Sequence, residues 1–118
     1  MKKFLAVYTG TAGSFDKWQR QFADPEARKA KEHAGMVAWG KWNDTQGKAI
    51  LDMGAPLGKT KLISAAGIQD SRNNLTGYTI VQAESHEAAA KMFLEHPHFS
   101  VFPGDAVELM EILPIPTR

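Results

Sequence analysis

The residues best suited to chemistry in this sequence are two histidines separated by one proline, His96-Pro97-His98. An imidazole titrates close to neutral pH, so either ring could act as an acid, a base or a metal ligand. The alternative is structural, because the C-terminus of a helix favours a histidine through the helix dipole. No third ligand stands at a spacing typical of a metal site, so we expect no bound metal.

A carboxylate interrupts the apolar segment at residues 50–53, where Asp52 follows isoleucine and leucine. If Asp52 projects into the covered face of a sheet, partial burial would suit it to proton transfer. If its strand lies at an edge, Asp52 would instead face water or accept a backbone hydrogen bond. His98 and Asp52 are the acid–base pair that we favour first.

Aromatic and cationic side chains near these positions could hold a flat ligand. The candidate ligand contacts are Trp39, Trp42, His96 and Phe99. Aromatic rings of this kind also pack in cores, which is the alternative for the two tryptophans. Arg72 lies in an expected loop, where it could bind a substrate carboxylate or extend into solvent.

The segment at 54–60, Gly-Ala-Pro-Leu-Gly-Lys-Thr, resembles a phosphate-binding loop only superficially. A phosphate loop has four residues between its glycines and a helix after Lys-Thr, whereas this segment has three and continues as an extended chain. We interpret it as a turn, and we expect no cofactor.

Composition limits the remaining function classes. A chain of 118 residues with 43% hydrophobic and 23% charged residues has the size of one domain, which we place at 1–118. The formal net charge of +1 argues against nucleic acid or an anionic membrane as partner. No apolar run is long enough to span a bilayer. The absence of cysteine and the short apolar run at the N-terminus favour a cytoplasmic protein.

Apolar patterning predicts the elements that position these side chains. We expect strands at 4–8, 49–53, 78–83 and 107–113, with 59–64 continuing the second strand beyond a kink. We expect a short helical stretch at 14–22 and a long helix from Pro25 to about Gly47, with an apolar stripe towards the sheet. A last helix, capped by Ser85, should end at about His96 because of Pro97. The order β-α-β-β-α-β predicts a ferredoxin-like α+β fold, an antiparallel sheet with helices on one face.

Both faces of the expected sheet are apolar. In the first strand, for example, Phe4, Ala6 and Tyr8 alternate with Leu5 and Val7. Two helices can cover only one face of a four-stranded sheet, and a soluble chain rarely exposes the other when it is apolar. We therefore expect a homodimer in which the second face packs on its copy.

Four short motifs, in this order and spacing, resemble the YCII-related family of dimeric α+β barrels, within the group that includes the DGPF-type proteins. They are the segment 54–57 after the second strand, 85–89 at the start of the last helix, 96–98 at its end, and 107–115 as last strand. The resemblance covers most of the chain. It implies a dimer with a cleft between sheet and helices, in a family whose members are mostly uncharacterised and in part act on small aromatic or chlorinated metabolites.

The resemblance also implies a second acid–base pair on the long helix, His33 and Asp44. Asp44 stands one residue further from Gly47 than in the family pattern. Three functions stay open at this point: a cofactor-independent acid–base enzyme of lyase or isomerase type acting on a small aromatic or lactone-like molecule, a non-catalytic small-molecule binding or sensing module, and an oligomerising accessory protein.

Overall fold

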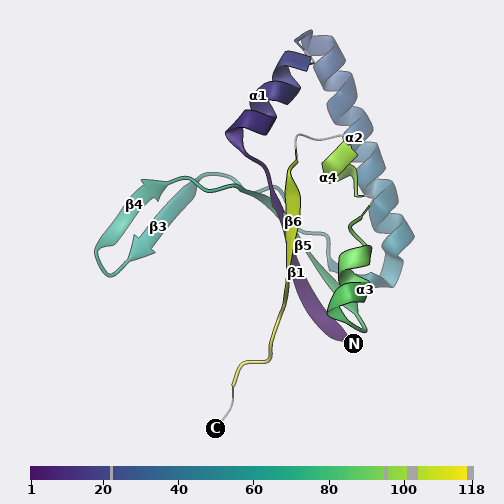
Figure 1. Cartoon of the computed structure of the whole chain (residues 1–118), viewed down its shortest axis with the longest axis vertical. Helices are drawn as coiled ribbons and strands as arrows, with labels where there is room; N and C mark the ends of the chain where they lie inside the picture. The colour runs from purple at the N-terminus through teal and green to yellow at the C-terminus, as the bar shows by residue number, and fades with distance from the viewer. Residues whose placement is uncertain (22, 95, 101–103, 117–118) are drawn as a thin grey trace.

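In the computed structural model, four strands form one antiparallel sheet in the order β2-β5-β1-β6 (Figure 1). These strands are β1 (Lys2–Thr9), β2 (Ile50–Asp52), β5 (Leu75–Ala83) and β6 (Ala106–Glu111). The structure describes residues 1–21, 23–94, 96–100 and 104–116, and for residues 14, 15, 18, 99 and 100 the backbone only. The strand order confirms the predicted ferredoxin-like α+β fold.

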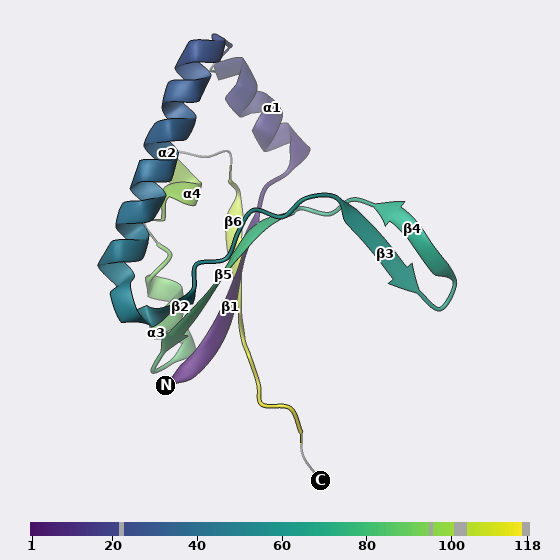
Figure 2. The same cartoon turned by 180° about the vertical axis from the view of Figure 1, so that it is seen from behind.

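The alternation along β1 separates the two faces of the sheet. Phe4, Ala6 and Tyr8 are buried on the side covered by helices and form the centre of the core. On β5, Val81 is buried on the same side, opposite Phe4 in the register. Leu5 and its neighbours in the register lie on the other side, where no helix covers them (Figures 1 and 2).

Two helices join β1 to β2. They are α1 (Ala12–Gln21) and α2 (Pro25–Gln46), and the short 3-10 turn η1 (Gly47–Ala49) follows. Asp24 caps α2 by accepting the Glu26 N–H, and Gly47, at φ 54°, ends it as predicted.

The prediction that the apolar stripe of α2 faces the sheet is wrong for most of the helix. Of the residues that make up this stripe, Trp42 is buried and Ala38 is half-buried, whereas the others are exposed: Ala27, Ala30, Ala34 and Val37. Only the C-terminal part of α2 contacts the core, because α1 and the start of α2 extend beyond the end of the sheet (Figure 1).

The last predicted helix is two helices, α3 (His86–Lys91) and α4 (Pro97–Ser100). Ser85 caps α3 as predicted, accepting the Ala88 N–H at 3.1 Å. The predicted end at His96 is wrong, since α3 ends at Lys91 and Pro97 begins α4. Proline has no N–H to lose in a first helical turn, so it starts a helix here rather than stopping one.

Residues 59–64 do not continue β2. They contain β3 (Thr60–Ser64), which pairs with β4 (Gly67–Ser71) in a separate two-stranded hairpin. The chain leaves the sheet at Gly54, where φ is 73° and a Cβ would come within 1.6 Å of the Tyr78 carbonyl oxygen. In the described part of the chain, no helix is long and apolar enough to cross a membrane.

Candidate functional site

Four polar side chains lie buried between the sheet and the helices. Tyr8 of β1 and Thr79 of β5 come from the sheet, and His96 and His98 come from the α4 region. His96 is fully buried and Tyr8 is 1% exposed. We call these four residues the buried polar chain. Side-chain hydrogen bonds join Thr79 to Tyr8 and Tyr8 to His96, and the backbone N–H of His98 binds His96.

The donors and acceptors along the buried polar chain can be assigned by starting from its two end residues, Thr79 and His98. Thr79 donates its one hydroxyl proton to the Met53 carbonyl at 3.1 Å, so Tyr8 must donate to Thr79 Oγ1 at 2.7 Å. At the other end, the backbone N–H of His98 donates to Nδ1 of His96 at 2.9 Å. Nε2 of a neutral His96 therefore carries the proton and donates to the Tyr8 oxygen at 3.3 Å.

His98 is held by the backbone of two strands. Its Nε2 lies 2.9 Å from the Thr9 carbonyl oxygen and 3.0 Å from that of Ala106, and it must donate because a carbonyl only accepts. Gly104 covers this imidazole, since a Cβ there would lie 2.2 Å from Cε1 and 2.4 Å from each ring nitrogen. The site therefore depends on a glycine at 104.

Burial keeps these groups neutral. Burial, with the neighbouring His98 as a second cause, lowers the pKa of His96 from 6.5 to about 3. Burial also lowers the pKa of His98, although the carbonyls of Thr9 and Ala106 and the charge of Asp105 oppose the shift. Burial raises the pKa of Tyr8 to about 12, against the hydrogen bond with Thr79. At neutral pH the two imidazoles and the phenol of the buried polar chain are therefore all uncharged.

Aromatic rings surround His96. The ring centroid of His96 lies 4.2 Å from that of Trp39 and 4.4 Å from that of Trp42, both at steep angles, and 5.9 Å from the stacked Phe93. The indole N–H of Trp42 donates to the Met92 carbonyl at 2.9 Å, which joins α2 to the end of α3. Trp39, Trp42 and His96, predicted as ligand contacts, are brought together, and the tryptophans pack on the core.

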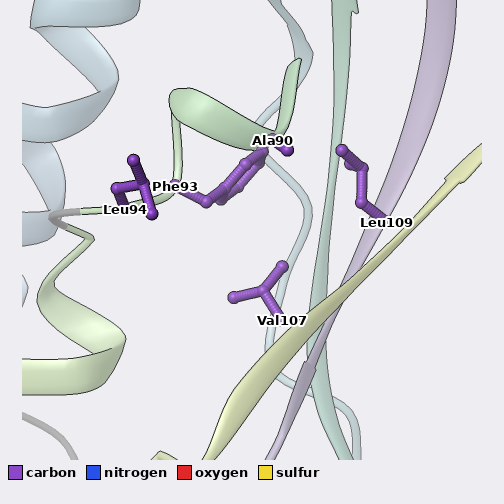
Figure 3. A pocket seen from close by; sticks show the side chains of 5 residues that line it. All are labelled: Ala90, Phe93, Leu94, Val107 and Leu109. Atoms are coloured by element: carbon purple, nitrogen blue, oxygen red, sulfur yellow. The ribbon is translucent and has the colours of Figure 1, made fainter. Parts of the chain in front are cut away.

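An apolar hollow of about 170 Å³ lies next to this cluster, between α3 and β6 (Figure 3). Its lining residues are Ala90, Phe93, Leu94, Val107 and Leu109. Phe93 belongs to both the hollow and the aromatic cluster, because its ring also stacks on His96. A groove of about 620 Å³ lies between α2 and the α3–α4 segment, and its lining includes Trp42, Lys41 and Lys91.

The two predicted acid–base pairs are not assembled. Asp52 is exposed on edge strand β2, where it accepts the Gly54 N–H at 2.8 Å, whereas His98 binds carbonyls of β1 and β6 across the sheet. Of the two interpretations of Asp52, the edge position is confirmed and the covered position is wrong, because β2 is an edge strand and the carboxylate caps its own turn. His33 and Asp44 are exposed on α2, eleven positions and about three turns apart along the helix.

The remaining predicted residues do not join the cluster. Arg72 is exposed after β4, and the ring of Phe99 lies outside the described side chains. The prediction that His96 and His98 sit at a helix C-terminus is wrong, since they stand at the start of α4. Within the described residues, no three histidine, aspartate or glutamate side chains gather at a distance that would hold a metal ion.

Reasoning from the sequence missed three residues of the site. Thr79 carried a usable signal, because it is a polar residue at an inward position between Gly77 and Val81 of a strand, and a buried hydroxyl needs a partner. Tyr8 was counted among the apolar residues of the first strand, without a role for its hydroxyl. Gly104 carried no signal, since its contact with His98 depends on the tertiary structure.

No protein-family model matches this chain, and no match is found among functionally curated proteins. Among solved structures, the chain resembles 5-chloro-2-hydroxyhydroquinone dehydrochlorinase (TftG) from Burkholderia phenoliruptrix AC1100, in complex with 2,5-dihydroxybenzoquinone. The two share 16% sequence identity over 92% of this chain and 90% of that chain, with a TM-score of 0.49. A likeness this distant assigns neither family nor reaction.

Proposed function

We propose that this chain is a homodimeric binding protein for a small aromatic molecule, which it holds in the hollow between α3 and β6. The observation that carries the proposal is the hollow itself, about 170 Å³ and lined by five apolar side chains. An apolar cavity of about 150 Å³ in another protein binds benzene, so one aromatic ring is the right size of ligand. Phe93 supplies an aromatic surface against which such a ring can stack.

The chemistry around the hollow favours binding over catalysis. None of its five lining residues titrates. Behind Phe93, both nitrogens of His96 are engaged, with the Tyr8 hydroxyl and the His98 N–H. Nε2 of His98 is engaged with two carbonyl oxygens. A base that serves catalysis needs a nitrogen directed at the substrate, and these three nitrogens are directed at the protein.

Titration with benzene and with phenol, followed by NMR chemical shifts, tests the binding proposal. Both should shift the resonances of Phe93 and Val107, and Ala90→Leu should abolish the shifts by filling the hollow. Ala88→Leu is the matched control, because Ala88 is exposed on the same helix and does not line the hollow. Equal shifts in both variants, or none in the wild type, would refute the proposal.

The homodimer is supported by the surface that one chain exposes. The accessible surface is 8618 Å² for a mass of 13.0 kDa, whereas a folded monomer of that mass exposes about 6,300 Å². The radius of gyration of 16.4 Å also exceeds the roughly 13.5 Å of a compact chain of this length. The excess of about 2,300 Å² per chain has the size of an obligate interface.

The uncovered face of the sheet is the surface that we assign to this interface. Its apolar side chains include Leu5 on β1, Ile80 on β5 and Met110 on β6, which are neighbours in the register. This arrangement, together with the four family motifs, supports membership of the YCII-related dimeric barrels. Sedimentation equilibrium should give twice the chain mass for the wild type and for Met36→Lys on α2, and the mass of one chain for Met110→Lys. A monomeric wild type would refute the dimer.

A further inference from the structure

The hairpin of β3 and β4 stands away from the rest of the chain, on the side of the sheet opposite α2 and α3 (Figures 1 and 2). A two-stranded hairpin with no covered face is marginally stable in water. Every residue from Lys61 to Asp70 is exposed. The hairpin nevertheless has a continuous register from Thr60–Ser71 to Ser64–Gly67, so its order calls for a packing surface that the described residues of this chain do not supply.

One face of the hairpin is apolar at its tip. Ile63 and Ile68 are directly opposed and are 69% and 74% exposed. The next pair on that face is Lys61 and Asp70, whose side chains form an ion pair across the strands. A cross-strand isoleucine pair in water gains little, whereas the same pair against an apolar surface gains the hydrophobic stabilisation of two large side chains.

The base of the hairpin is fixed to the sheet, which sets its direction. Pro56 forms a β-bridge with Gly77, and Leu57 N–H donates to the Thr76 carbonyl at 3.0 Å. On the return side, Asn73 donates to Thr60 Oγ1 at 3.2 Å and so closes the base. The hairpin therefore projects from a defined place on β5 towards the side on which a second copy would pack.

We propose that the β3–β4 hairpin is an arm that clasps a second copy of this chain through the Ile63–Ile68 face. The inference rests on the proposed dimer and extends it. The chain exposes about 2,300 Å² more than a compact monomer of its mass, and its exposed surface includes the hairpin as well as the open sheet face, so a partner that covers both accounts for more of this excess than one that covers the sheet face alone. The arm is continuous with that face, and two-fold symmetry makes the clasp reciprocal.

The test compares the double variant Ile63→Ser/Ile68→Ser with Met36→Ser/Val37→Ser, whose side chains are also exposed but lie on α2. Sedimentation equilibrium should show a dimer dissociation constant raised by about 100-fold or more in the hairpin variant, because each chain loses two buried isoleucines. The α2 variant should keep the wild-type constant.

Hydrogen exchange of the unaltered chain gives an independent readout. Amides of residues 60–71 should be protected at high protein concentration and should exchange rapidly in the monomeric Met110→Lys variant. Two results would overturn the clasp and leave the dimer standing. One is a dimer dissociation constant that is the same in the wild type and the hairpin variant. The other is hairpin amides of the wild-type dimer that exchange equally fast at all concentrations. A monomeric wild type would overturn both.

Discussion

Acidification should destabilise the protein through His96. Its pKa is about 3 in the folded chain and 6.5 as an ordinary histidine, so below pH 6.5 the unfolded chain binds a proton that the folded chain does not. The contribution of His96 to the free energy of unfolding is therefore fully present above pH 6.5 and is lost as the pH falls towards 3. Between pH 6.5 and pH 5 the free energy of unfolding should fall by about 2 kcal/mol, because each pH unit costs about 1.4 kcal/mol.

The physical reason is that a proton on Nδ1 of His96 has no acceptor. That atom accepts the His98 N–H at 2.9 Å, so protonation would place two donors face to face and charge a fully buried ring. His96→Asn offers an oxygen that can accept the same N–H and does not titrate. His33→Asn, on the exposed surface of α2, removes a histidine without this environment.

Urea unfolding at pH 7 and at pH 5, at one protein concentration, measures the effect. Between pH 7 and pH 5, the free energy of unfolding should fall by about 2 kcal/mol more in the wild type and in His33→Asn than in His96→Asn. His98, whose pKa is also lowered, adds a loss of the same sign in all three proteins. The reasoning would be refuted by equal losses in all three, or by an NMR titration of His96 near pH 6.5.

Three further substitutions test the packing around the site, each by chemical denaturation at pH 7. Tyr8→Phe removes the hydroxyl in the middle of the buried polar chain and should cost about 1–2 kcal/mol, with the strand content unchanged by circular dichroism. Gly104→Ala should cost about 2 kcal/mol or more, because the new methyl group would overlap the His98 ring, and the ring resonances should move. Gly54→Ala should cost about 3 kcal/mol or more, through its positive φ and its contact with a β5 carbonyl, whereas Gly58→Ala, in open space, should stay within about 0.5 kcal/mol. A cost at Gly54 no larger than that at Gly58 would contradict this account of the turn.

Local rules were sufficient for most of the fold. The N-caps at Asp24 and Ser85, the helix end at Gly47 and the four sheet strands were predictable because each depends on a few neighbouring residues. The alternation in β1 likewise predicted which side chains share a face, but both faces are apolar, so it did not say which of them the helices would cover. Pro97 was ambiguous, since a proline is compatible both with the end of one helix and with the first turn of the next.

Long-range contacts decided the rest. The length of α2 followed from its caps, but how much of it meets the sheet depends on where α1 places its start. The strand partners of the two imidazoles are distant in sequence, since Tyr8 stands 88 positions before His96 and Thr9 stands 89 positions before His98. Whether an imidazole is a base or a buried structural group depends on those partners and on burial, and no local pattern in the sequence contains them.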